Sequence, residues 1–165
     1  MADKLLIGIL GKRGAGKSFT WNSAFKHPVR TGKHLRKYYV SENEYVNVFL
    51  ISGSPTERKM PVAELLPSEL PDIVFSSFEF TSNLRETLGF FIKNGYKIDM
   101  AWLNPGYGDK TVSKLFYTFG ITNYMLKNGI HLNIRNGNEN IDNRIKDLNE
   151  VVYGWAKFRN LIYSE

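Results

Sequence analysis

The chain has 165 residues, no cysteine and a formal net charge of +6. This length fits a single domain, residues 1–165, which can bury about 70% of the surface of its unfolded chain. The lack of cysteine excludes a disulfide scaffold and a cysteine-based zinc site. Every apolar run falls far short of the roughly 20 residues that span a bilayer, so we expect a soluble, cytoplasmic protein with no membrane partner.

The first predicted strand and the loop after it contain the most informative motif. Leu5–Leu10 is a short apolar stretch that predicts a buried strand, and Ser18–Phe25 predicts the beginning of a helix. The eight residues at this junction fit the pattern G-x-x-x-x-G-K-S/T, and they are Gly11, Lys12, Arg13, Gly14, Ala15, Gly16, Lys17 and Ser18. Glycines let backbone N–H groups turn inward there, and the helix N-terminus presents partial positive charge. The motif predicts a polyphosphate site at which Lys17 contacts the β- and γ-phosphates and Ser18 binds Mg²⁺.

A block of basic residues follows this helix, with no acidic residue inside it. The basic block consists of Lys26, Arg30, Lys33, Arg36 and Lys37. Its charge nearly equals the net charge of the chain, so it predicts an anionic partner. A solvated loop that keeps the protein soluble is an equally good interpretation. Nucleic acid is a weaker one, because no zinc-finger, homeodomain or RNP-type motif accompanies the charge.

The rest of the chain alternates predicted strands with predicted helices. The strands are apolar runs that end at Gly, Pro or Asn, and the helices show apolar residues at helical spacing. The predicted strands are 45–51, 73–78, 96–103 and 130–134, and the predicted helices are 84–92, 112–127 with a break at Gly120 and a stop at Asn128 and Gly129, and 141–162. Such alternation predicts a parallel sheet covered by helices on both faces.

Ligands of such sheets bind beyond the carboxyl ends of the strands. The loops predicted at that edge are all rich in Gly, Ser, Asn or Pro, and they are 11–16, 52–55, 77–80, 104–108 and 135–137. Loops of this composition can approach a ligand closely. We therefore expect one composite site along this edge.

The motif at Gly11–Ser18, on the first of about five strands, resembles that of P-loop NTPases, and the compact chain is most similar to their nucleoside and nucleotide kinase branch. The resemblance implies an α/β, single-domain, three-layer fold with a mostly parallel five-stranded sheet in the order 2-3-1-4-5. It also implies an acidic residue at the end of the strand beside the P-loop, which holds Mg²⁺ through water or acts as a base. Glu79 stands about where that strand ends and is the candidate for both roles.

The same resemblance implies that the loop after the fifth strand packs on the nucleotide base. Arg135 and Asn136 occupy this position, where arginine stacks on a purine and asparagine hydrogen-bonds to its edge. An ordinary strand-ending turn is an equally good interpretation. Arg13, Arg135 and Arg144 are the candidates for stabilising transferred phosphate, and for Arg144 a surface salt bridge is an equally good role.

The predicted function is a phosphotransferase that uses ATP (or GTP) and Mg²⁺ to phosphorylate a small acceptor. An acceptor that already carries phosphate, such as a nucleoside monophosphate, suits the positive charge of the basic block. Ser52, Ser54 and Arg58 are candidates for the acceptor pocket, although Ser52–Pro55 also fits a plain turn. The alternative is a nucleotide-binding switch or sensor with slow or no hydrolysis, and a nucleic-acid-associated ATPase ranks third.

Overall fold

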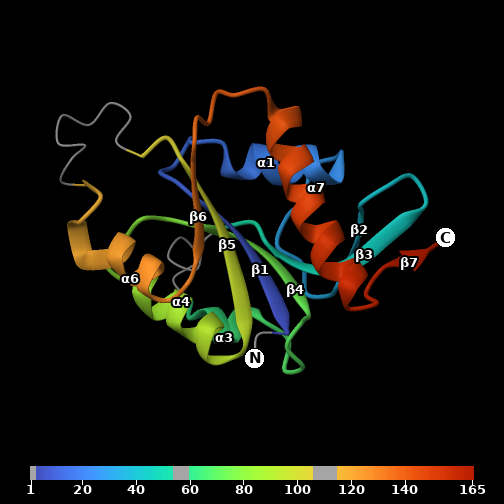
Figure 1. The fold of residues 1–165 in the computed structure, drawn as a ribbon, viewed down its shortest axis with the longest axis horizontal. Helices are drawn as coiled ribbons and strands as arrows, with labels where there is room; N and C mark the ends of the chain where they lie inside the picture. Colours follow the sequence, from blue (N-terminus) through green and yellow to red (C-terminus); the bar gives the residue numbers. More distant parts are fainter. Residues whose placement is uncertain (1–2, 54–59, 106–114) are drawn as a thin grey trace.

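A mostly parallel sheet forms the centre of the structure, a computed structural model that describes residues 3–53, 60–105 and 115–165 (Figure 1). Seven strands are found in these ranges: β1 (Lys4–Leu10), β2 (Arg36–Tyr39), β3 (Glu44–Ile51), β4 (Ile73–Phe78), β5 (Tyr96–Leu103), β6 (His131–Arg135) and β7 (Tyr163–Ser164). Their order is β2-β3-β4-β1-β5-β6, and β7 also pairs with β3. The predicted α/β class with a mostly parallel sheet is confirmed.

The predicted count of five strands is wrong, and the complete order of the sheet differs from the predicted one because two additional strands join it. The additional strands β2 and β7 both pair with β3 in antiparallel orientation. β2 has four residues and begins inside the basic block, and β7 has only two residues. Strands this short show no alternation of apolar and polar residues that a sequence pattern can reveal.

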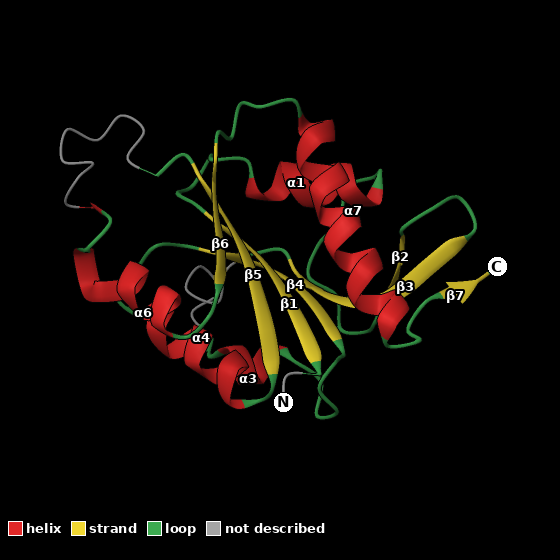
Figure 2. Cartoon of the chain, viewed as in Figure 1, coloured by secondary structure: helices red, strands yellow, loops and turns green. Residues whose placement is uncertain are grey.

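Helices cover both faces of the sheet, which makes three layers (Figure 2). On one face, α1 (Lys17–Phe25) and α7 (Ile141–Phe158) pack in one apolar cluster. On the other face lie α3 (Val62–Leu65), α4 (Leu84–Lys93), the 3₁₀ helix η1 (Thr118–Gly120) and α6 (Ile121–Lys127). In the parts of the chain that are described, no helix is long and apolar enough to cross a membrane.

Two predicted helices can be compared with the structure. The break predicted at Gly120 is present: Gly120 is left-handed (φ 66°), and α6 follows it from Ile121 to Lys127, directly before the predicted stop at Asn128 and Gly129; residues 112–114 lie outside the described ranges. The C-terminal helix ends at Phe158, short of the predicted residue 162. Asn160 adopts a φ of 57° there, and this left-handed conformation reverses the chain after the helix.

Parallel pairing brings the ends of the central strands to one edge of the sheet. Leu10 at the end of β1 pairs with Phe78 of β4 on one side and with Trp102 of β5 on the other. Leu103 of β5 in turn pairs with Arg135 of β6. The loops that follow β1, β4, β5 and β6 therefore leave the sheet side by side, as a composite site requires.

Candidate functional site

The loop at Gly11–Ser18 joins β1 to α1 in a conformation that depends on glycine. Gly14 has a φ of 83° and Gly16 a φ of 109°, a region that residues with a Cβ rarely adopt. A Cβ built on Gly14 would meet no atom within 4 Å. Position 14 therefore needs glycine for its backbone conformation and not for lack of space. The loop leads directly into the N-terminus of α1.

Helix α1 is anchored so that its N-terminus meets this loop. Trp21 is completely buried, stacks on Phe75 of β4 with ring centroids 5.3 Å apart, and donates from Nε1 to Ser77 Oγ at 2.8 Å. The first N–H groups of a helix have no acceptor within the helix. Together with the helix dipole, they make this end of α1 suited to an anion.

Lys17 and Glu79 lie next to each other at the carboxyl edge. The Lys17 side chain is only 7% exposed, and its Nζ donates to the backbone oxygen of Gly11 at 2.7 Å. The same Nζ lies 3.9 Å from Glu79 Oε1. Glu79 directly follows β4, the strand beside β1, which is the location expected from the sequence. A buried cation and a carboxylate are thus paired at the beginning of α1.

An open pocket of about 740 Å³ lies in front of this pair. Its lining combines the glycine-rich loop with the ends of β3 and β4: Arg13, Gly14, Gly16, Lys17, Ser18, Phe19, Ser52 and Glu79. This volume falls in the usual range of ligand pockets, roughly 300–1,000 Å³. Ser18 and Glu79, the two predicted Mg²⁺ ligands, therefore line the same pocket.

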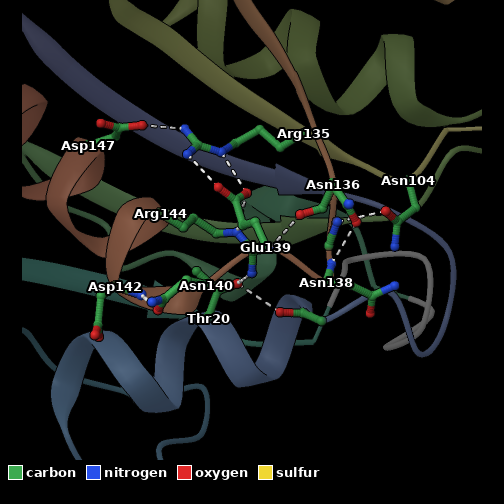
Figure 3. Close-up of polar contacts among 12 residues, drawn as sticks. Thr20, Asn104, Arg135, Asn136, Asn138, Glu139, Asn140, Asp142, Arg144 and Asp147 are labelled. Atoms are coloured by element: carbon green, nitrogen blue, oxygen red, sulfur yellow. Dashed lines mark hydrogen bonds and ion pairs between the residues drawn. The ribbon is translucent and has the colours of Figure 1, made fainter.

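The loop after β6 packs against the glycine-rich loop, and Figure 3 shows the polar contacts of its side chains. Gly137 donates its N–H to Asn104 Oδ1 at 2.6 Å, and Asn104 donates its own N–H to the backbone oxygen of Arg135 at 2.9 Å. A Cβ on Gly137 would lie only 2.5 Å from the backbone oxygen of Ala15. The loops after β1, β5 and β6 thus form one packed unit.

Arg144 connects α7 to these packed loops by hydrogen bonds. It is the main residue whose location the sequence did not predict. It is 3% exposed, so the surface salt bridge considered from the sequence is wrong. Its Nη1 donates to Thr20 Oγ1 at 2.8 Å, and Thr20 Oγ1 donates to the backbone oxygen of Gly16 at 2.7 Å (Figure 3). Burial lowers the pKa of Arg144 below its ordinary value, and the nearby Glu139 carboxylate, 3.5 Å from Nε, offsets only part of this lowering.

A signal for this burial is present in the helical pattern of α7. Arg144 stands four residues before Leu148 and eight before Val152, on the stripe that packs against the sheet and α1. The start of α7 is set by Asn140, whose side chain accepts a hydrogen bond from the N–H of Asp142 at 3.0 Å. A charged residue on an apolar stripe needs buried partners, and Thr20 is the partner that α1 supplies.

Arg135 is the last residue of β6 and Asn136 follows it, as predicted. Both side chains make hydrogen bonds within the protein. Arg135 donates from Nε and Nη2 to the two carboxylate oxygens of Glu139 at 2.9 and 2.8 Å, and from Nη1 to Asp147 at 2.6 Å. These hydrogen bonds lower the pKa of Glu139 and raise that of Arg135. Asn136 Oδ1 accepts from the N–H of Asn138 at 2.9 Å. Contact of Arg135 and Asn136 with a nucleotide base stays a prediction.

The basic block is divided in the structure and does not present five equivalent charges. Lys37 Nζ lies 3.0 Å from Glu165 Oε1, and this hydrogen bond raises the pKa of Lys37. Arg36 donates to the backbone oxygen of Arg30 at 2.7 Å and lies 5.7 Å from the ring centroid of Phe25. These two side chains are tied to structural partners.

Another part of the basic block lies beside the pocket. Thr31 Oγ1 accepts a hydrogen bond from the N–H of Ser52, a pocket residue, at 2.8 Å. Arg30 and Lys33 flank this contact and are exposed, as is Lys26 at the end of α1.

Some predicted site residues lie outside the described residues. They are Ser54 and Arg58, predicted for the acceptor pocket, and residues 106–108 of the predicted composite site.

No protein-family model matches the chain, and no curated protein matches its sequence. Among the residues described, no group of three or more His, Cys, Asp or Glu side chains could hold a metal ion by itself. Function must therefore be inferred from the pocket in front of Lys17 and from the loops that surround it.

Proposed function

We propose that this chain is a P-loop phosphotransferase, which binds a nucleoside triphosphate with Mg²⁺ and transfers its γ-phosphoryl group to a small acceptor. The observation that carries the proposal is the pairing of Lys17 with Glu79, 3.9 Å apart, in a pocket at the N-terminus of α1. A cation for phosphate and a carboxylate for Mg²⁺ or for the attacking hydroxyl are the groups that this chemistry needs.

The arrangement of the parallel strands supports the P-loop fold. In chain order these strands are β1, β3, β4, β5 and β6, and they lie side by side as second, third, first, fourth and fifth. This is the order that the resemblance to P-loop kinases implies. The antiparallel strands β2 and β7 are additions beside β3.

The residues of the pocket fit a triphosphate with its metal. The positive φ of Gly14 and Gly16 lets the loop turn backbone N–H groups towards an anion. Mg²⁺ is commonly held by one or two protein oxygens together with phosphate oxygens, so the Ser18 hydroxyl and Glu79 are a sufficient protein contribution. Bound there, Mg²⁺ would neutralise charge on the phosphates.

In the proposed reaction the bond between the γ-phosphorus and its bridging oxygen breaks, and a bond from an acceptor hydroxyl or phosphate oxygen to that phosphorus forms. Lys17 balances negative charge on the transferred group. Where the acceptor is a hydroxyl, Glu79 accepts its proton and later releases it to solvent. The nucleoside diphosphate leaves with the electron pair of the broken bond, so catalysis depends on positioning and charge neutralisation.

The decisive experiment follows the label of γ-labelled ATP in the presence of Mg²⁺ and a pooled set of nucleosides, nucleotides and sugars. We expect label on an acceptor. Lys17→Ala should weaken ATP binding roughly 10- to 150-fold, because a charged contact to phosphate is worth about 1.5–3 kcal/mol. Glu79→Gln should keep ATP binding and suppress Mg²⁺-dependent transfer.

Lys97→Ala is the matched control, because it removes one exposed lysine at the amino end of β5, the opposite edge of the sheet. It should change neither binding nor transfer. Unchanged ATP affinity in Lys17→Ala would contradict the phosphate site. Full activity in Glu79→Gln would contradict the assigned carboxylate and leave the binding site standing.

A nucleotide-dependent switch is the second candidate function, and the link from Gly16 through Thr20 to Arg144 favours it. This link connects the phosphate loop to α7, so a change at the loop has a path to the surface of that helix. The switch predicts nucleotide-dependent protease sensitivity or oligomeric state with negligible turnover. Label released only as phosphate, or left on ATP, would shift the assignment to this function.

A further inference from the structure

The two margins of the sheet differ in their protection against pairing with another chain. β6 lies at one margin, and β2 with the short β7 lies beside β3 at the other (Figure 1). Unpaired strand edges are templates for further pairing, and proteins commonly protect them with exposed lysine, with proline or with very short strands. The β2 margin has such features, because Lys37 is 50% exposed and β7 has two residues. β6 lacks them, since its five residues, HLNIR, include neither lysine nor proline.

The charged residue of β6 does not protect this margin. Arg135 is only 18% exposed, because its guanidinium is held on the side of α7 by Glu139 and Asp147 at 2.8 and 2.6 Å. His131, at the other end of the strand, lies 3.2 Å from Asp99 of β5. The pairing of β6 with β5 is continuous from His131 to Arg135. At about 3.3 Å per residue, a strand of this length can receive another strand.

The backbone groups of Leu132 and Ile134 face away from the sheet. Asn104 donates its N–H to the backbone oxygen of Arg135 at 2.9 Å, and Leu103 is the register partner of Arg135. The backbone groups of Arg135 therefore face β5. Because these groups alternate in direction from one strand residue to the next, those of Leu132 and Ile134 face outward. Within the described parts of the chain, β5 is the strand that pairs with β6, so the outward groups are open to another strand.

The outward groups of β6 match those of a second, antiparallel copy of the same strand. With Asn133 on the twofold axis, Leu132 of one copy lies opposite Ile134 of the other. Residues opposite each other in a hydrogen-bonded pair exchange both N–H···O=C bonds, and the axis repeats this pair. Registers displaced along the strand would need the N–H of Ile130 or the C=O of Asn136, which already make hydrogen bonds within the chain. The strand therefore defines one register for pairing with itself.

The side chains of β6 also suit this register. Ile134 is 55% exposed, and Leu132 packs against the apolar cluster of α4 and α6. Both side chains lie on the same face because strand residues alternate. An exposed isoleucine is not unusual by itself, but pairing would place it opposite Leu132 of the second copy, as an apolar cross-strand pair. On the other face His131 lies opposite Arg135, whose charge the carboxylates of Glu139 and Asp147 balance.

We propose that β6 is a homodimer interface, at which two copies of this chain pair antiparallel about Asn133 and join their sheets into one. A pair of this kind is isologous and closes after two copies, whereas pairing of β6 with the β2 margin would continue from subunit to subunit. The interface is independent of the proposed phosphotransferase function. It leads into the candidate site, since the loop after β6 packs against the glycine-rich loop.

Single cysteines test the register, because the chain has none of its own. Asn133→Cys would place its two thiols in a non-hydrogen-bonded pair with Cα atoms about 4.5 Å apart, within the range of about 4.4–6.8 Å that disulfides span. His131→Cys is the matched control, since its two copies would lie about 13 Å apart along the strands. In a glutathione redox buffer, Asn133→Cys should form at least about tenfold more covalent dimer than His131→Cys on non-reducing gels.

Sedimentation of the full chain at about 1–300 μM measures the equilibrium, at an ionic strength of about 0.15 M that screens the net charge of +6. We expect the mass to rise with concentration from 19.0 kDa towards that of a dimer. Ile134→Lys removes the apolar pair, and Ile134→Pro removes an outward N–H that an edge strand can spare. Because the axis repeats each change, both should raise the dimer Kd at least about tenfold.

Leu35→Lys is the control for the added charge, because Leu35 is 51% exposed and directly precedes β2 at the opposite margin. It should associate as the wild type does. The inference is overturned if the wild type stays monomeric over the whole range, or if Asn133→Cys and His131→Cys form covalent dimer equally. It is also overturned if the Ile134 variants associate like the wild type, or if Leu35→Lys weakens association as much as Ile134→Lys.

Discussion

Replacing Arg144 by methionine tests whether the buried guanidinium stabilises the packed loops or is merely accommodated by them. Methionine has a similar length and suits the apolar stripe of α7, so it removes the charge without leaving a large cavity. The substitution deprives Thr20 Oγ1 of its donor at 2.8 Å and leaves Glu139 bound only to Arg135. The contact with the Asn136 backbone oxygen, at 3.4 Å, is long and adds little.

The expected loss of stability follows from these contacts. A hydrogen bond from a charged donor contributes about 1.5–3 kcal/mol, and the lost ion pair with Glu139 adds to it. Desolvation of the guanidinium, which also lowers its pKa, offsets part of the sum. We expect the free energy of unfolding to fall by about 2–3 kcal/mol, which corresponds to roughly 4–12 °C in Tm for a domain of this size.

Urea unfolding followed by tryptophan fluorescence measures this loss. The control is Lys146→Met, which makes the same change at an exposed position of α7 and removes only the ion pair with Glu150 at 4.0 Å; it should alter stability by less than about 0.5 kcal/mol. A double-mutant cycle of Arg144→Met with Thr20→Val should give a coupling of about 1–2 kcal/mol. Equal stability of the Arg144 and Lys146 variants would refute the reasoning.

Two further predictions concern the same loops. Gly137→Ala should lower stability by about 1–3 kcal/mol and weaken ATP binding, because its Cβ would lie 2.5 Å from the Ala15 backbone oxygen. The control Gly154→Ala adds a Cβ in open space on helix α7 and should raise stability by about 0.5–1 kcal/mol. Thermal melts and ATP titrations measure both variants, and equal effects of the two substitutions would contradict this prediction. Because Arg135 lowers the pKa of Glu139 below its ordinary 4.5, its stabilisation is complete above that pH and is lost as the pH falls through the lowered value. Acid unfolding of Glu139→Gln should accordingly be less steep than that of the wild type, and identical curves would contradict the pairing.

The conformation of the glycine-rich loop could be predicted from the sequence because its determinants are local. Gly14 and Gly16 must adopt positive φ where a strand turns into a helix, and this requirement is visible in a run of eight residues. Glu79 could be located because β4 is an apolar run whose end is evident. The strands β2 and β7 could not be predicted, since two to four residues paired at the sheet margin have no periodicity of their own.

The sequence by itself determined the α/β architecture, the strand-to-helix junction that presents Lys17, and the edge at which the site forms, because hydrophobic period and glycine conformation act over short stretches of chain. Only the tertiary structure decided that Arg144 donates a hydrogen bond to Thr20, that Gly137 packs against Ala15, and that the Phe119 ring lies beside the Phe80 ring. These contacts join residues up to 124 positions apart. They depend on the packing of whole helices and loops, and no local pattern records which distant partners that packing brings together.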